Sequence, residues 1–111
     1  MGYEIKFFHK VKHPTKNIDY AIEVDTSLSI TYNIREMFFV ASGGYFLKDL
    51  TNIPREFFEK IIAHALLNLK TKDFKEYNSP NGWGTQEGLT RFLVNLLEEV
   101  EEKDVDIMEI F

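Results

Sequence analysis

The spacing of the hydrophobic residues changes twice along this chain, and these changes limit the folds that it can adopt. Apolar and polar residues mostly alternate in the segments 3–12, 18–25 and 27–33, as in strands with one buried face. Between residues 34 and 100 the apolar residues recur three and four positions apart, which is typical of amphipathic helices. Residues 104–111 alternate again. The spacing therefore predicts three strands, three helices and a last strand, in this order.

This order predicts an α+β fold, in which three helices pack on one face of a small, mostly antiparallel sheet. The chain has 111 residues, which suits one domain, so we expect a single domain over residues 1–111. The last strand is expected beside the first, because the first is rich in lysine and the last is rich in acidic residues.

Residues of helix-capping type mark where the helices begin and end. Asn33 is the expected N-cap of the first helix, which Gly43 and Gly44 would end. Pro54 suits the first turn of the second helix, and Thr85 suits the N-cap of the third. The stripe expected to be buried in the second helix contains Phe57, Phe58, Ile61, Ile62, Ala65, Leu66 and Leu69, and that in the third contains Leu89, Phe92, Leu93, Leu96, Leu97 and Val100. The inward positions expected in the second strand are Ile18, Tyr20, Ile22 and Val24, and those in the last strand are Val105, Ile107 and Phe111.

The composition excludes several classes of protein. The chain has no cysteine, which excludes disulfides, thiol catalysis and cysteine-bound zinc. No apolar run approaches the ~20 residues of a membrane helix, so we expect no membrane association and a cytoplasmic location. The net charge of −5 argues against general nucleic-acid binding, which needs a basic face. Ten phenylalanines leave apolar area that a homodimer could cover, and the oligomeric state stays open.

The negative charge is concentrated at residues 98–111, where seven acidic residues stand against one lysine. The simpler interpretation is a solvated helix face. The alternative is a surface that docks a basic partner protein or mimics nucleic-acid phosphates. Its candidate residues are Glu98, Glu99, Glu101 and Glu102.

Two polar segments, each directly before a predicted helix, have the composition of built loops. Residues 78–85 hold the only tryptophan of the chain between two glycines, and residues 29–33 place small hydrogen-bonding side chains on one strand face. Both segments should converge at one end of the domain and form a ligand pocket. In the alternative interpretation, Trp83 pins its loop onto the core and Asn33 only caps a helix. The candidate ligand-binding residues are Thr31, Tyr32, Asn33, Asn81, Gly82, Trp83, Gly84 and Thr85.

Within this site we expect Trp83 to stack on a base, while backbone amides near Thr85 and Gln86 face a phosphate or carboxylate. No catalytic residues are predicted, because no nucleophile motif is present and no acid–base pair can be identified. A small enzyme acting on a nucleotide or glycan is the third hypothesis, with Asp25, Glu36 and His64 as its candidates. We predict no metal or other cofactor, since four strand residues between His9 and His13 span roughly 13 Å.

The motifs resemble a group of small proteins of bacteriophages and mobile elements. The similar segments are Ile30-Thr31-Tyr32-Asn33 followed by Met37-Phe38, and Asn78-x-x-Asn81-Gly82-Trp83-Gly84 followed by a Leu/Phe-rich helix. The resemblance covers about residues 28–110, and the chain departs from it at Ser29, where Asn is expected, and at Gln86, where an aromatic residue is common.

The resemblance implies a setting in the host-cell cytoplasm and a role directed at the host, such as counteracting its defence. The preferred hypothesis is a non-enzymatic protein that sequesters a small nucleotide-like ligand. The alternative is a protein that inhibits a host defence protein through the acidic residues.

Overall fold

The first strand organises the sheet of this protein, whose computed structural model describes residues 2–111. β1 (Gly2–Lys12) pairs antiparallel with β2 (Asp19–Val24), β3 (Ser29–Thr31) and β4 (Ile107–Ile110). The first residues of β1, Gly2 to Glu4, pair with β3. Its middle pairs with β4, and its last half pairs with β2. The predicted antiparallel sheet is thus confirmed, and so is the pairing of the last strand with the first.

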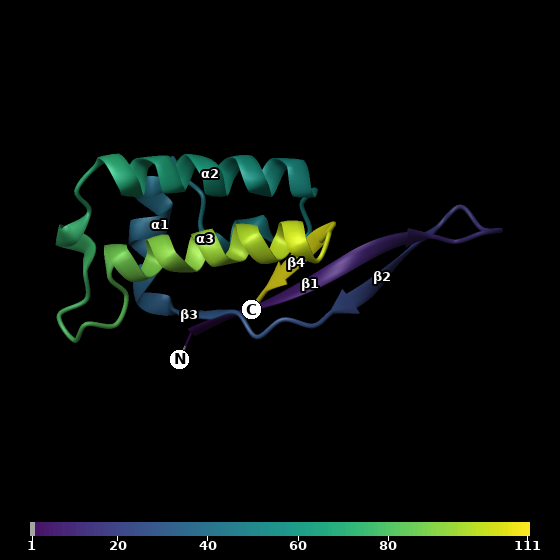
Figure 1. Cartoon of the computed structure of the whole chain (residues 1–111), viewed down its shortest axis with the longest axis horizontal. Helices are drawn as coiled ribbons and strands as arrows, with labels where there is room; N and C mark the ends of the chain where they lie inside the picture. Colours follow the sequence, from purple (N-terminus) through teal and green to yellow (C-terminus); the bar gives the residue numbers. More distant parts are fainter. Residues whose placement is uncertain (1) are drawn as a thin grey trace.

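Three helices complete the predicted α+β fold. α1 (Arg35–Ala41), α2 (Arg55–Thr71) and α3 (Gln86–Glu102) lie together on one side of the sheet, with α2 and α3 running alongside each other (Figure 1). Short 3₁₀ turns occupy Tyr32–Ile34, Leu47–Leu50 and Lys75–Tyr77. Gly43 and Gly44, at φ 84° and 113°, end α1 as expected, and the Gly44 amide donates to the carbonyl of Phe39 over 2.8 Å. No helix within residues 2–111 is both long enough and apolar enough to cross a membrane.

The core lies between the helices and the N-terminal half of β1. Tyr3, Ile5 and Phe7 are buried from β1, and most of the expected helical stripes are buried with them. The buried helical residues are Met37, Phe38, Ala41, Phe58, Ile62, Ala65, Leu66, Leu69, Leu89, Phe92, Leu93, Leu96 and Val100. The buried stripes of α2 and α3 are narrower than predicted. Phe57 of α2 is 52% exposed, and Ile61 of α2 and Leu97 of α3 are half-buried. Phe57 and Ile61 are four residues apart and share a flank of α2, where Ile61 still packs against the core.

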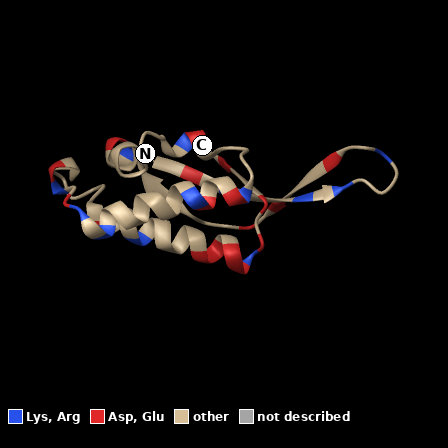
Figure 2. Ribbon diagram, turned by 90° about the horizontal axis from the view of Figure 1, so that it is seen from above, with Lys and Arg blue, Asp and Glu red and all other residues tan. Residues whose placement is uncertain are grey.

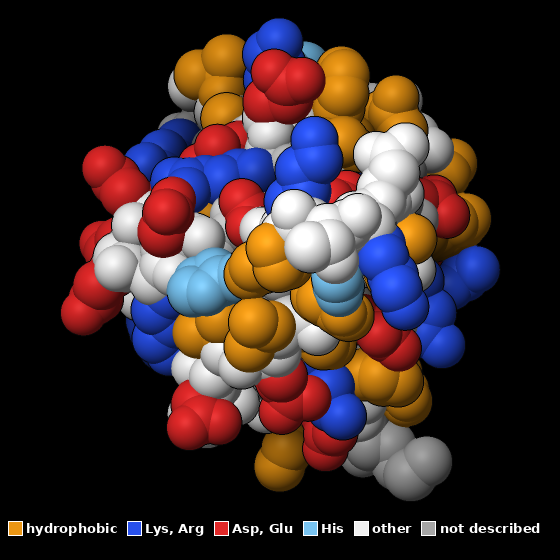
Figure 3. Space-filling model, turned by 90° about the vertical axis from the view of Figure 1, so that its right-hand side faces the viewer, with side chains coloured by type: hydrophobic (Ala, Val, Ile, Leu, Met, Phe, Trp, Pro, Cys, Tyr) orange, Lys and Arg blue, Asp and Glu red, His pale blue; other side chains and the backbone are white. Residues whose placement is uncertain are grey.

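The β1–β2 hairpin extends past the core as an arm, which lengthens the molecule to 54 Å against 25 and 22 Å (Figures 1 and 2). Val11 faces Tyr20 and His9 faces Ile22, so these side chains share one face of the arm. The prediction that this face is buried was wrong, because no other element covers it: Tyr20 is 46% and Ile22 is 52% exposed. Hydrophobic side chains and histidines are visible together on this end (Figure 3). A homodimer that would cover this area stays a prediction.

The last strand has the predicted partner but the wrong inward face. Val105 is buried, yet Ile107 is only half-buried and Phe111 is exposed, while Met108 and Ile110 enter the core. The alternation is broken between the buried residues Val105 and Met108, where the chain bends at Asp106 and the Asp106 amide donates to the Phe8 carbonyl over 3.0 Å. Because three positions separate Val105 from Met108, the strand presents Met108 and Ile110 to the core in place of Ile107.

Candidate functional site

The loop that contains the tryptophan is held in shape by its own polar groups. The side-chain oxygen of Asn81 accepts hydrogen bonds from the Ser79 hydroxyl (2.6 Å) and the Trp83 amide (3.0 Å). Gly82 and Gly84 have φ values of 78° and 90°, in the region that favours glycine. The loop is therefore an ordered structure, as its composition predicts.

The two polar segments predicted to converge are in direct contact. The Asn33 side-chain amide donates to the Trp83 carbonyl over 3.1 Å and approaches the Ser79 hydroxyl at 3.5 Å. Gly84 packs so closely against this asparagine that a Cβ on Gly84 would lie 2.7 Å from the Asn33 Cβ. The start of α1 and the start of α3 are thus joined through the loop.

The prediction that Asn33 is a helix N-cap was wrong. Thr31 caps the 3₁₀ turn instead, since its hydroxyl accepts from the Asn33 amide over 3.3 Å. The turn intervenes before α1, whose N-terminus has no side-chain cap. Asn33 consequently lies inside the turn, and its side chain is free to hold the tryptophan loop.

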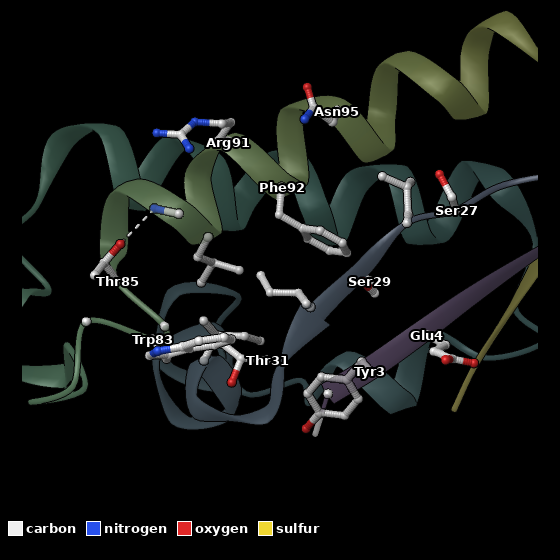
Figure 4. A pocket seen from close by; sticks show the side chains of 18 residues that line it. Tyr3, Glu4, Ser27, Ser29, Thr31, Trp83, Thr85, Arg91, Phe92 and Asn95 are labelled. Atoms are coloured by element: carbon white, nitrogen blue, oxygen red, sulfur yellow. Dashed lines mark hydrogen bonds between the residues drawn. The ribbon is translucent and has the colours of Figure 1, made fainter.

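Trp83 does not anchor its loop to the core. Its side chain is 68% exposed, more than any other large hydrophobic side chain in residues 2–111, so that alternative interpretation was wrong. The Trp83 carbonyl, and not the ring, makes the contact with Asn33. The ring stands at the edge of a pocket, near Thr31 (Figure 4).

This pocket has a volume of about 820 Å³, which lies in the usual range for small-molecule sites. Five candidate residues line it: Thr31, Gly82, Trp83, Gly84 and Thr85. Asn81 shapes the loop from outside the pocket, while Tyr32 and Asn33 line a smaller neighbouring cavity of about 380 Å³. Whether any of the eight binds a ligand stays a prediction.

Side chains that were not predicted complete the pocket wall. Arg91, Phe92 and Asn95 reach it from α3, and Tyr3 and Glu4 reach it from β1 (Figure 4). Arg91 and Asn95 are four residues apart and therefore share a helix face beside the buried stripe. That polar pair was the available indication, but its meaning depends on where the helix lies.

Among the residues that line the pocket, Tyr3 has a phenol whose pKa is shifted by its surroundings. Its ring is buried and lies edge-on to Tyr32, with ring centroids 4.6 Å apart. Burial raises the pKa of the Tyr3 phenol, while the positive charge of Arg35 acts in the opposite direction. The phenol is therefore neutral at physiological pH and can donate a hydrogen bond.

Two backbone amides in the first turn of α3 are already paired within the protein. Thr85 caps the helix as predicted, because its hydroxyl accepts from the Gly88 amide over 3.0 Å. The Gln86 amide donates to the Asn78 side chain over 2.8 Å. The Gln86 and Gly88 amides are therefore satisfied within the protein. Binding of a phosphate or carboxylate by other amides near Thr85 stays a prediction.

The acid–base candidates of the enzyme hypothesis lie in separate places. Asp25 lines a cavity beside β1, Glu36 lines the small cavity with Tyr32, and His64 lies on α2 near Gly43. In residues 2–111 no group of three or more His, Cys, Asp or Glu side chains is arranged to hold a metal ion.

The acidic residues near the end of α3 divide into two kinds. Glu98, Glu101 and Glu102 are exposed, and red segments of the ribbon gather at this end of the helix (Figure 2). Glu99 is half-buried, forms an ion pair with Lys103 at 2.6 Å and accepts a hydrogen bond from the Thr26 hydroxyl. Glu99 is thus a structural residue, and only the other three form a free acidic surface.

Comparisons with known proteins found no match: no family model, no curated protein and no solved structure matches this chain. The likeness to phage and mobile-element proteins remains an expectation from the two motifs.

Proposed function

We propose that this protein captures a small nucleotide-like ligand in the pocket beside Trp83, without transforming it. The observation that carries the proposal is an exposed tryptophan ring on a rigid loop at the edge of a pocket of about 820 Å³. The apolar ring of an exposed tryptophan stays in contact with water unless a partner covers it. A flat nucleobase is a suitable partner because it can stack on the ring.

The arrangement favours binding because little has to be ordered when the ligand arrives. Asn81 holds the loop from within, and Asn33 holds it from the neighbouring segment. A site that is already formed loses less conformational entropy on binding than a flexible one. Hydroxyl and amide groups of Ser29, Thr31 and Asn95 line the pocket and can hydrogen-bond the polar edge of a base or a sugar.

The separation of Asp25, Glu36 and His64 supports capture over catalysis. Stoichiometric capture is also a mode of action that suits a phage protein in the host cytoplasm, where removing a nucleotide signal would weaken a defence response. This biological setting is part of the proposal and comes from the resemblance.

Binding can be measured directly, because Trp83 is the only tryptophan and its fluorescence reports on the pocket. Native mass spectrometry after incubation with a host-cell metabolite extract should show a small-molecule mass gain. We expect Trp83→Ala to weaken binding roughly 10-fold or more, since stacking contributes about 1–3 kcal/mol per base. Unfolding by urea should change little, because the ring is mostly exposed.

Phe57→Ala is the matched control, since Phe57 is an exposed aromatic residue that does not line the pocket. It should retain the bound ligand. Equal ligand retention by Trp83→Ala and the native protein would contradict the proposal.

The second candidate function is inhibition of a basic host protein by the acidic surface Glu98, Glu101 and Glu102. The observation that favours it is that these carboxylates are exposed and make no ion pair within residues 2–111. Changing all three to glutamine should abolish capture of such a partner from host lysate, and salt should weaken that capture. Glu76→Gln, an exposed site on the 3₁₀ turn Lys75–Tyr77, is the control, and capture that survives the triple change would exclude this function.

A further inference from the structure

A second cavity adjoins the pocket. It is lined by more positive than negative side chains, although the protein as a whole is negatively charged. It has a volume of about 850 Å³, lies between the end of α2 and the start of α3, and shares Thr85 and Arg91 with the pocket. Lys70, Lys72 and Lys75 line it, and we call it the lysine cavity. In the close-up, the Arg91 guanidinium points away from Asn95 and over Thr85 (Figure 4).

The cationic groups of the lysine cavity outnumber its acids. Three lysines and Arg91 stand against Asp73 and Glu87, in a protein with a net charge of −5. None of the three lysines forms an ion pair within residues 2–111. Arg91 reaches only Glu87, at 3.4 Å on an exposed surface, where a pair contributes little. The cavity therefore presents positive charge that the described chain does not neutralise.

The backbone that carries these lysines is fixed in place. The Gln86 side chain donates to the carbonyls of Leu69 and Lys72, both over 2.8 Å, and accepts from the Phe74 amide over 2.8 Å. This residue ties the end of α2 to the first turn of α3. A favourable interaction with the negative C-terminal end of the helix dipole can explain Lys70 and the C-cap residue Lys72, but Lys75 lies beyond the helix.

We infer that the captured ligand is a nucleoside polyphosphate, with its base at Trp83 and its phosphates in the lysine cavity. This inference rests on the proposed function. The shared residues Thr85 and Arg91 provide the path between the two cavities, and a guanidinium can bind a phosphate through two parallel hydrogen bonds. The lysines supply point charges for the remaining phosphate oxygens.

The test is a titration of the full chain, followed by Trp83 fluorescence, with adenosine, AMP, ADP and ATP and with the guanosine series. We expect affinity to rise with each phosphate, so that a triphosphate binds about 10-fold or more tighter than its nucleoside. The double variant Lys72→Ala/Lys75→Ala should lose most of that difference and leave nucleoside binding unchanged. Lys60→Ala, an exposed lysine outside the cavity, should behave as the native protein.

The outcomes separate this inference from the proposed function. Nucleosides that bind as tightly as their triphosphates would overturn the inference and leave the proposed function standing. Absence of any fluorescence change in both series would count against nucleotide capture itself. Pyrophosphate that binds without competing against ATP would show that the lysine cavity is a separate anion site, which also overturns the inference.

Discussion

Gly84→Ala will lower the free energy of unfolding by about 3 kcal/mol, whereas Gly82→Ala will lower it by only about 1 kcal/mol. Both glycines have a positive φ, 90° and 78°, so a side chain at either site is strained. They differ in their surroundings. A Cβ on Gly84 would lie 2.7 Å from the Cβ and 3.1 Å from the carbonyl carbon of Asn33, whereas at Gly82 nothing lies within 4 Å.

The larger effect of the Gly84 substitution therefore measures the contact between the two polar segments. Urea denaturation followed by far-ultraviolet circular dichroism gives the two free energies of unfolding. The Gly84 variant should also lose the pocket, because the loop must move away from Asn33 to make room. Equal destabilisation by the two substitutions would show that the segments are not packed together in solution.

Gln86→Glu will destabilise the protein by about 3 kcal/mol at neutral pH, because the native amide donates to two carbonyls and a carboxylate cannot. The carbonyls of Leu69 and Lys72 would lose their donor and face a negative charge instead. The neighbouring change Glu87→Gln is the control, since Glu87 is exposed and should alter stability by less than about 0.5 kcal/mol.

The pH dependence of this variant gives a second measurement. The two facing carbonyls should raise the pKa of the introduced carboxyl in the folded state above about 4.3, the usual value for Glu, because their effect should outweigh that of the exposed, solvent-screened lysines of the lysine cavity. The native state then binds the proton more tightly than the unfolded state, so stability relative to the native protein recovers as the pH falls through that raised pKa. A stability difference that does not change between pH 7 and pH 4 would contradict the hydrogen-bond arrangement of Gln86.

The order of strands and helices could be predicted because alternation and helical spacing are local properties. Whether a face is covered is not local. Tyr20 and Ile22 alternate as in a half-buried strand, yet no helix reaches the arm, so they remain exposed. The same limitation applies to β4, where a bend at Asp106 exchanges the inward face.

The candidate site was predictable to the extent that its residues are adjacent in sequence. The two polar segments stand out by composition, and each precedes a helix, so their contact through Asn33 and Trp83 could be expected. Arg91, Asn95 and the lysine cavity could not be, since these side chains become neighbours only through the placement of α3 against α2 and β1. Asn33 shows the same effect at one residue, because an intervening 3₁₀ turn changes its role from a cap to a tether.

The central place of β1 has a consequence for how the protein can be made. The sheet joins the beginning of the chain to its far end, where Glu4 and Phe111 exchange two backbone hydrogen bonds of 3.1 and 2.9 Å. The ribosome synthesises β1 well before β4. The β1–β4 pairing must therefore wait until residues 107–111 have left the exit tunnel. Until then the inner face of β1 has to be shielded by the helices alone, and the nascent chain carries an unfinished sheet.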